Sequence, residues 1–537
     1  MVSLVLFTPL LASLFVLLLR KEHEDGARWV AFSASLLTFF LSLGLLWQFD
    51  SKVAGFQMVE RVPWIPDFGI EYYVAIDGIS LFLVLLTTFL VPLVILSSWN
   101  DVHKRVKEYQ FLFLVLETGM IGAFVAIDLF LFYVFWEVML IPMYFLVGVW
   151  GGPRRIYAAI KFLLYTMVGS LLMLVAILYL AYLHNDQFHT VSFNLLDLYK
   201  LNISDYAQRW LFWAFVLSFA IKVPLFPFHT WLPDAHVEAP TGGSVILAGV
   251  LLKMGTYGLL RFAIPLFPFA AHQYAYVLIA LAVIGIFYGA LVAMVQPDLK
   301  KLVAYSSVSH MGFVVLGLFA FNLQGTQGAI FQMLNHGLST GALFLLVGVV
   351  YERRHTRLIS EYGGLWKQVP LYAAIFMVTM FSSIGLPGLN GFVGEFLIML
   401  GAFDAVVQKG IASTSAEVNW FIMIFAVSGV VLGAVYMLWM YQRVIFGPLK
   451  SDENKKLTDL SSREVLVFTP LLVMMLVMGL FPKPFLDRME KSVTATLAHA
   501  EAKRVADTSR FRSAQETSTA STVSRKVVTQ LMLHPLP

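Results

Sequence analysis

The 537-residue chain contains no cysteine. Disulfide bonds, cysteine-ligated iron–sulfur clusters and c-type haem attachment are therefore excluded. The chain also lacks a G-x-G-x-x-G segment after a predicted strand and a G-x-x-x-x-G-K-[ST] segment, so neither common phosphate-binding loop is present. Redox chemistry or nucleotide hydrolysis that drives this protein must therefore take place in a partner chain.

Charged residues are also scarce. They make up 13% of the chain, whereas hydrophobic residues make up 59%, and the mean hydropathy is +0.78. A soluble domain carries about 25% charged residues, so the composition predicts an all-α polytopic membrane protein. The first 21 residues are apolar but lack a basic start and a small-residue cleavage site, and they predict a retained first helix rather than a signal peptide.

The apolar runs define the predicted membrane spans. A span needs about 20 mostly apolar residues. The sequence predicts fourteen spans, at about residues 2–19, 28–48, 78–99, 110–126, 129–150, 157–183, 209–229, 243–264, 274–295, 301–321, 327–350, 370–402, 419–445 and 465–482.

Lysine and arginine are distributed unevenly between the connecting loops. Alternate loops, beginning with the loop at residues 20–28, hold 19 of these cations, and the other loops hold six. The positive-inside rule places the richer set in the cytoplasm. Both termini are then expected on the outer, periplasmic side.

The last residues differ from the rest. Residues 485–537 are polar and rich in Ser, Thr, Ala and basic side chains. We expect an amphipathic helix up to about residue 507 and disorder beyond it.

Three ionisable side chains lie inside otherwise unbroken apolar stretches of predicted spans: Glu137, Lys222 and Lys253. A charge at mid-bilayer costs roughly 2.5–3.5 kcal/mol on insertion scales, so such residues usually mark an ion or proton path. Less specific interpretations remain: Lys222 could extend to the interface, and Glu137 could be a neutral acid that forms hydrogen bonds within the bundle.

Two spans are interrupted at corresponding places. Pro224 and Pro227 follow Lys222, and Pro387 precedes Glu395 in a glycine-rich segment. Each interruption falls in the third of five consecutive spans, which is the pattern of inverted repeats around a mid-membrane site. Glu395 would be the titrating group of the second half, or alternatively a residue at a helix end near water.

These patterns divide the chain into five parts. The parts are residues 1–108 with helices 1–3, 109–264 with helices 4–8 as the first repeat, 265–446 with helices 9–13 as the second repeat, 447–484 with a loop and helix 14, and the polar tail 485–537.

Weaker candidates lie near these residues. His310 and His336 fall in predicted spans and titrate near neutral pH, so they could relay protons between Lys253 and Glu395 or could equally be packing residues. Lys161 could extend the polar axis or reach the interface. The nearby group His229, Asp234, His236 and Glu238 has no spacing typical of a zinc site, and we expect no metal there.

Three segments resemble a known family. FWEVMLIPMYFLVG, KVPLFPFHTWLPDAHVEAPTGGSVILAGVLLKMGTYGLLRF and GLPGLNGFVGEFLIML are similar to signature segments of the proton-translocating, antiporter-like subunits of respiratory complex I. The resemblance covers about residues 70–480 and is strongest to the M-type branch. The L-type branch has a lysine in the second broken helix and a long lateral helix, whereas this chain has Gly394-Glu395 and a short polar tail.

The resemblance implies roles for the buried charges. Glu137 and Lys222 would form an ion pair, Lys253 would be the central lysine, and Glu395 would be the output residue. It also implies fourteen helices and L-type and N-type antiporter-like neighbours. The Lys and Arg content and the length of 537 residues favour a bacterial inner membrane over that of an organelle. No cofactor would be held here and no nucleic acid bound. FMN, iron–sulfur clusters and quinone would belong to partner subunits. Two other functions remain open: the D-type subunit of a multisubunit sodium/proton antiporter, and a scaffold that no longer pumps.

Overall fold

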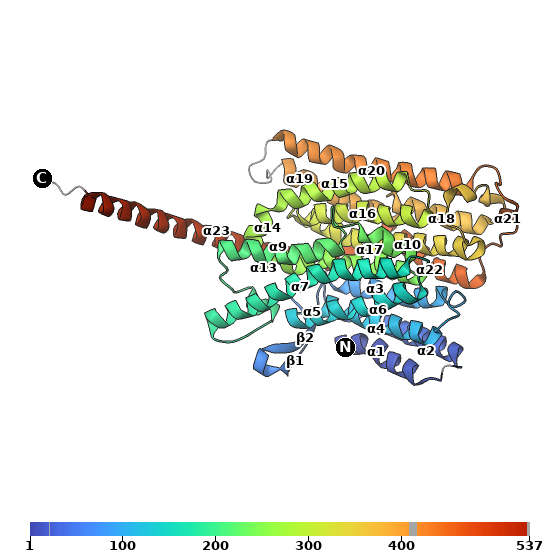
Figure 1. Cartoon of the computed structure of the whole chain (residues 1–537), viewed down its shortest axis with the longest axis horizontal. Helices are drawn as coiled ribbons and strands as arrows, with labels where there is room; N and C mark the ends of the chain where they lie inside the picture. The colour runs from blue at the N-terminus through green and yellow to red at the C-terminus, as the bar shows by residue number, and fades with distance from the viewer. Residues whose placement is uncertain (21, 408–415, 534–537) are drawn as a thin grey trace.

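The computed structural model describes residues 1–20, 22–407 and 416–533 (Figure 1). Its helices run side by side along one direction and form a single bundle. Within the described residues, ten helices are long and apolar enough to cross a membrane, and three shorter apolar helices accompany them. The prediction of an all-α polytopic membrane protein is therefore confirmed. Lys21 and Lys409, one from each predicted set of loop cations, lie outside the described residues.

The N-terminal part contains three helices and a hairpin. The helices are α1 (Val2–Leu18), α2 (Glu24–Gln48) and α3 (Leu81–Ser97), and the antiparallel strands are β1 (Gln57–Ile65) and β2 (Ile70–Ile76). The helix-only prediction missed this hairpin, whose turn depends on Gly69 at a φ of +65°. That left-handed conformation favours glycine.

The first predicted repeat contains a helix that is interrupted after Lys222. Its elements are α4 (Val106–Val125), α5 (Leu129–Val138), α6 (Leu140–Trp150), α7 (Arg155–Phe188), α8 (Leu195–Leu198), α9 (Asp205–Lys222), α10 (Trp231–Glu238), α11 (Thr241–Ile246), α12 (Leu252–Gly258) and α13 (Ile264–Leu266). Two π-helical segments, Leu247–Leu251 and Leu259–Ala263, flank α12.

The break after α9 is satisfied locally. Proline cannot donate a backbone hydrogen bond, so carbonyls one turn earlier lose their usual partners. The Ala220 carbonyl instead accepts from the Leu225 N–H at 2.7 Å, and the Ile221 carbonyl accepts from the Trp231 indole N–H at 2.9 Å. These contacts allow non-helical backbone to exist inside an apolar bundle.

The second predicted repeat has its own break. Its elements are α14 (Pro268–Gln273), α15 (Ala275–Met294), α16 (Leu299–Leu318), α17 (Leu323–Arg354), α18 (Pro370–Ser383), α19 (Asn390–Val407) and α20 (Ala416–Ile445). Between α18 and α19 the chain turns through Gly385 and Gly388, with φ values of +74° and +94°. The two interruptions that the sequence predicts are both present.

The C-terminal part differs from the prediction. After α21 (Asp452–Lys455) and α22 (Ser462–Leu480), α23 runs as one helix over Lys483–Leu533, where we expected a shorter helix and a disordered end. Its first half is held by tertiary contacts that a polar composition does not reveal. The Ser492 hydroxyl accepts from the Gly78 N–H at 2.9 Å, and the Gln208 amide donates to Asp507 at 2.5 Å.

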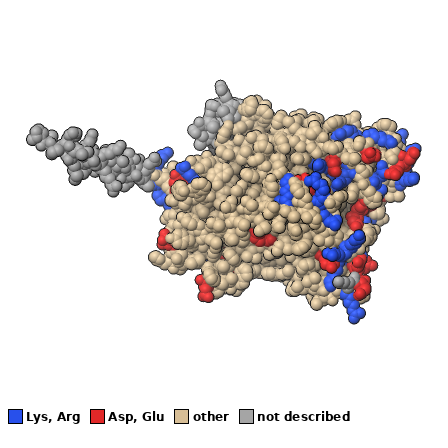
Figure 2. All heavy atoms as spheres, viewed as in Figure 1, with Lys and Arg blue, Asp and Glu red and all other residues tan. Residues whose placement is uncertain are grey.

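The surface charge is polarised along the bundle. In the face that Figure 2 shows, blue and red atoms gather at the end where α2, α18 and α21 lie, and the long middle of the bundle is almost uncharged. We call this the basic end. α23 leaves from the opposite end (Figure 1). The arrangement matches the alternating loop charges of the sequence.

A buried ion pair connects α3 to the end of the first repeat. Arg261 and Asp77 are each 3% exposed, and the Arg261 guanidinium lies 2.5 Å from the Asp77 carboxylate. Asp77 also accepts from the backbone N–H groups of Ile79 and Ser80. Arg261 is one of the six cations that the sequence analysis counted in the less basic, outer set of loops. Its burial in the π-helical segment Leu259–Ala263 corrects that interpretation.

We predict that Asp77→Asn destabilises the protein by about 3–5 kcal/mol, because it leaves a buried guanidinium without a counter-charge. Thermal unfolding of the detergent-solubilised assembly measures the loss. The matched control is Asp205→Asn, which removes the half-exposed partner of Arg209 and should change stability by less than about 1 kcal/mol. Equal effects of the two substitutions would contradict the prediction.

Candidate functional site

Lys253 lies at the centre of the bundle. It is fully buried on α12, two residues after the π-helical segment Leu247–Leu251. Such segments leave backbone carbonyls outside the regular α-helical ladder and often occur at functional sites. The Lys253 ammonium donates to the Ala248 carbonyl in this segment, and its Nζ also lies 2.6 Å from His336 Nδ1 on α17.

A line of polar side chains continues from His336 towards the second broken helix. The rings of His336 and His310, on α17 and α16, have centroids 5.9 Å apart. His310 Nδ1 lies 2.9 Å from Glu395 Oε1 on α19. The structure therefore brings Lys253, His336, His310 and Glu395 together, and we call these four residues the central chain.

The predicted pair Glu137–Lys222 is not closed. Lys222 is 1% exposed, and its Nζ has no hydrogen-bond partner among the described residues. It lies 5.0 Å from the centroid of the Trp136 ring, where a cation is attracted to the aromatic face. Glu137 Oε1 is likewise buried without a partner. Adjacent residues of a helix point about 100° apart, so the Trp136 side chain faces Lys222 and the Glu137 side chain takes a different direction, although its charge still acts on Lys222.

The Lys161 side chain is bound to the segment that follows the interruption after α9. Its Nζ lies 2.7 Å from Asp234 Oδ2 on α10 and donates to the Thr230 carbonyl at 2.9 Å. Both partners are near the bundle surface, because Lys161 and Asp234 are 20% and 28% exposed. This contact connects α7 to α10 and does not reach the central chain.

The four residues that could suggest a metal site are dispersed. Asp234 pairs with Lys161, and Glu238 accepts from the Arg154 N–H at 2.9 Å. The His236 ring stacks on Phe344 with centroids 4.5 Å apart. Within the part of the chain that the structure describes, no three His, Cys, Asp or Glu side chains are arranged to hold a metal ion.

The sequence reading missed two polar residues beside the central chain. Gln332 donates to Glu395 Oε1 at 3.0 Å, and Asn335 donates to Gln332 at 3.0 Å. Residues 332, 335 and 336 are spaced three and four apart, which places them on one face of α17. That spacing around a buried histidine is a signal that could have identified them.

The sequence predicts that Glu117 and Asp128 flank a short turn between two spans. Asp128 lies at this turn, but Glu117 is fully buried within α4, and neither of its carboxyl oxygens has a partner among the described residues. Asp128 caps α5, because its side chain accepts from the Phe130 and Leu131 N–H groups. The role of Asp128 is therefore to begin a helix.

Two families match the chain over adjacent ranges. Residues 126–418 match the family described as NADH:quinone oxidoreductase/Mrp antiporter, TM. Residues 1–126 match the amino terminus of NADH-ubiquinone oxidoreductase chain 4.

Individual proteins agree with these families. NADH-quinone oxidoreductase subunit M of Rhodobacter capsulatus is 49% identical over 92% of this chain and 95% of its own length. A chain of respiratory complex I from Thermus thermophilus superposes with a TM-score of 0.83 at 33% identity, over 93% of this chain and all of that one. A chain of the Mrp complex from Dietzia sp. DQ12-45-1b shares the fold, with a TM-score of 0.80 at 20% identity over 94% and 99% of the two chains.

Three findings agree with each other. The first 126 residues match the chain 4 amino terminus, more than half of the sequence matches one antiporter-like family, and nearly the whole chain is similar to a subunit M. They confirm the resemblance that the three signature segments indicate. The chain belongs to the subunit M (chain 4) family of NADH:quinone oxidoreductases, within the antiporter-like membrane subunits.

Proposed function

We propose that this protein is a proton-translocating membrane-arm subunit of an NADH:quinone oxidoreductase. Electron transfer from NADH to quinone takes place in partner subunits, and the buried Glu and Lys residues of this chain move protons in response. The observation that carries the proposal is the central chain, in which Lys253 and Glu395 are connected through two histidines inside an apolar bundle.

The contacts of the central chain suit proton transfer in short steps. Lys253 and His336 are close enough to share a hydrogen bond, at 2.6 Å. His310 and Glu395 are similarly close, at 2.9 Å. Histidine can accept a proton on one ring nitrogen and release one from the other. A proton that leaves Lys253 can therefore pass to His336, and His310 can pass one to Glu395. The His336 and His310 rings are 5.9 Å apart between centroids and their Nε2 atoms have no partners among the described residues, so a bridging water would complete the path.

Glu137 and Lys222 would act as the input switch. When they are paired, the carboxylate stabilises the charged lysine, and when they separate, Lys222 can release its proton to the next group. Two charges 4 Å apart interact by about 4 kcal/mol at an effective dielectric constant of 20. Moving one charge against 100 mV costs about 2.3 kcal/mol. Opening or closing such a pair is therefore on the energy scale of pumping.

We also propose which subunits and which membrane surround this chain. L-type and N-type antiporter-like subunits would be its neighbours, and FMN, iron–sulfur clusters and quinone would be held by other subunits. The membrane would be the bacterial inner membrane, with both termini on the periplasmic side. The polarised loop charges support this orientation.

A second candidate function is the D-type subunit of a sodium/proton antiporter. The shared family description and the fold of the Mrp complex favour keeping it. Purification distinguishes the two functions, because only the oxidoreductase subunit would be recovered with an NADH-oxidising arm that contains flavin and iron–sulfur clusters.

We predict that Glu137→Gln leaves the complex assembled and lowers both NADH:quinone turnover and proton pumping at least about tenfold, because the switch loses its negative charge. Both activities are measured in membrane vesicles. Glu490→Gln, on the exposed side of α23, is the control. Wild-type pumping would exclude Glu137 from the path, and loss of sodium/proton exchange with normal NADH oxidation would favour the antiporter.

Lys222→Arg tests deprotonation at the first half. Arginine keeps the positive charge but does not release its proton in proteins. We expect an assembled complex in which pumping falls about as far as it does in Lys222→Ala, measured in the same vesicles. Normal pumping with arginine at this position would show that Lys222 acts only as a fixed charge.

His336→Gln tests the central chain. Glutamine keeps polar atoms near Lys253 but cannot carry a proton at neutral pH. We expect pumping to fall by at least about tenfold, whereas His189→Gln, in the connection after α7, should have little effect. Equal pumping in both variants would mean that protons bypass His336.

A further inference from the structure

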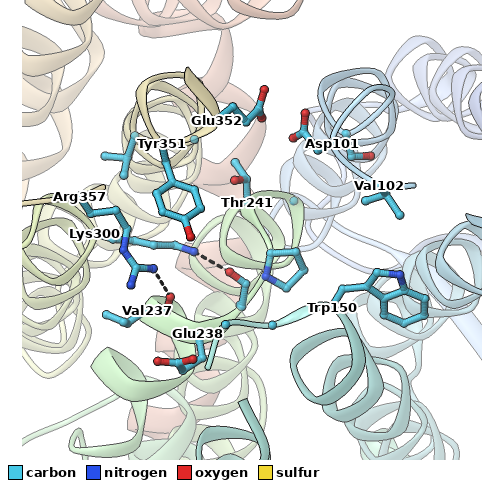
Figure 3. A pocket seen from close by; sticks show the side chains of 18 of the residues that line it. Asp101, Val102, Trp150, Val237, Glu238, Thr241, Lys300, Tyr351, Glu352 and Arg357 are labelled. Atoms are coloured by element: carbon cyan, nitrogen blue, oxygen red, sulfur yellow. Dashed lines mark hydrogen bonds between the residues drawn. The ribbon is translucent and has the colours of Figure 1, made fainter. Parts of the chain in front are cut away.

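A water-accessible cavity of about 580 Å³ lies at the basic end of the bundle, between the N-terminal helices and the two repeats (Figure 3). Asn100, His103 and His355 line it and are exposed. Gly242 and Tyr109 line it from the buried side. The cavity therefore leads from the aqueous surface towards the beginning of α11.

The cations that line the cavity are bound to backbone. The Lys300 ammonium donates to the Ala239 carbonyl at 2.5 Å, and the Arg357 guanidinium donates to the Val237 carbonyl at 2.5 Å (Figure 3). These carbonyls lie at the C-terminal end of α10, where positive charge is favourable. Lys300 and Arg357 thus stabilise the end of the first broken helix.

Two carboxyl groups meet on the other side of the cavity. Asp101, in the loop after α3, and Glu352, near the end of α17, both line the cavity and lie close together in Figure 3. Each of the two groups acts on the protonation of the other. Two carboxylates at close range repel each other, so the pair favours a state in which one proton is shared between them.

The environment of Asp101 favours retention of that proton. Burial raises the pKa of Asp101 and the charge of Glu464 adds to this effect, whereas the neighbouring Glu352 side chain and the positive charges of Arg463 and His103 oppose it. Neither Asp101 nor Glu352 forms an ion pair with a cation among the described residues. Arg353, next to Glu352, instead binds Glu464 at 2.8 Å. No cation that forms an ion pair therefore holds the two carboxyl groups ionised at the cavity wall.

A second polar group points to a ligand at this place. Tyr109 is fully buried and lines the cavity, and its hydroxyl has no hydrogen-bond partner among the described residues. A Cβ atom on Gly242 would lie only 2.9 Å from this hydroxyl, so the hydroxyl meets the cavity floor where glycine leaves room. A buried hydroxyl without a protein partner is usually satisfied by water.

One helical segment connects the floor of the cavity with the central chain. Thr241, which lines the cavity, begins α11, and the same helical segment carries Lys253 about 18 Å further on at 1.5 Å per residue. His236 lies between them. It is fully buried with both ring nitrogens unpartnered among the described residues, and the charges of both Lys300 and Lys253 act on it.

We infer that Asp101 and Glu352 form a proton-loading site, in which one shared proton is held at the basic end and supplied through the cavity to Lys253. The pair gives its proton to water in the cavity and then takes another from water at the rim, so that it returns to the shared state. This inference rests on the proposed function, because it assumes that Lys253 needs protons.

The test uses the intact complex in vesicles and in detergent. Glu352→Gln and Asp101→Asn each leave one carboxyl group that has lost its proton-sharing partner and ionises at lower pH. We expect turnover at pH 6 within about twofold of wild type, and a ratio of turnover at pH 8 to pH 6 that is lower by at least about threefold. Infrared difference spectra should also lose the carbonyl band of a protonated carboxyl group.

Two controls define the outcome. Asp452→Asn, an exposed carboxylate on α21 paired with Lys455, should retain both the pH ratio and the carbonyl band. The exchanged variant Asp101→Glu with Glu352→Asp keeps two carboxyl groups and should restore most of the pH ratio, which separates proton sharing from a packing defect.

An unchanged carbonyl band in Glu352→Gln, or an unchanged pH ratio in both single variants, would overturn the loading site. If Glu137→Gln still abolished pumping in the same experiments, the proposed function would stand and only this inference would fail. If Glu137→Gln also pumped normally, the proposed function itself would fail.

Discussion

Every buried charge in this bundle has to be stabilised by other protein groups, because there is no bulk water or lipid headgroup nearby. An ion in an apolar environment pays a desolvation penalty of several kcal/mol unless hydrogen bonds or opposite charges compensate. The chain meets this constraint in different ways. Arg261 has the Asp77 carboxylate, and Lys253 has a carbonyl and an imidazole. Lys222 has the faces of the Trp136 and Phe162 rings and the charge of Glu137 acting without a hydrogen bond. Lys222, which carries the least compensated of these charges, is the lysine that we propose acts in the input switch.

Close helix packing brings the compensating groups within reach. A Cβ atom on Gly255 would lie 2.6 Å from the Phe219 carbonyl, so glycine lets α12 approach α9. A Cβ atom on Gly394 would lie 2.6 Å from the Gln332 amide oxygen. That close approach of α19 to α17 allows the neighbouring Glu395 to contact Gln332 and His310. Small residues at helix contacts serve this purpose in membrane proteins generally.

The sequence predicted the elements whose signals are local. Apolar runs, loop charges and prolines indicated the spans, their alternation and the two breaks, and the segments around Glu137, Lys222 and Glu395 indicated the family. Features that depend on side-chain direction or on distant contacts were not predictable in the same way. The offset of Glu137 from Lys222 depends on which face of α5 carries Trp136. The helical course of α23 depends on contacts with Gly78 and Gln208, which lie far away in sequence.

The difference between the two halves has a consequence for coupling. Hydrogen bonds join Lys253 to His336 and His310 to Glu395, whereas Lys222 has no hydrogen bond to any described residue. A proton cannot pass from Lys222 to Lys253 by direct hydrogen bonds in this arrangement, but charge can still act at a distance. At an effective dielectric constant of 20, two unit charges 10 Å apart interact by about 1.7 kcal/mol, which is more than a tenfold change in a protonation equilibrium. Loss of a proton from Lys222 would therefore make Lys253 easier to protonate. When Lys222 is paired with Glu137, its charge acts less on Lys253, because the carboxylate offsets the lysine charge. In the proposed mechanism, this structure is the state in which Lys253 can exchange a proton with His336 while Lys222 forms no hydrogen bond with Glu137.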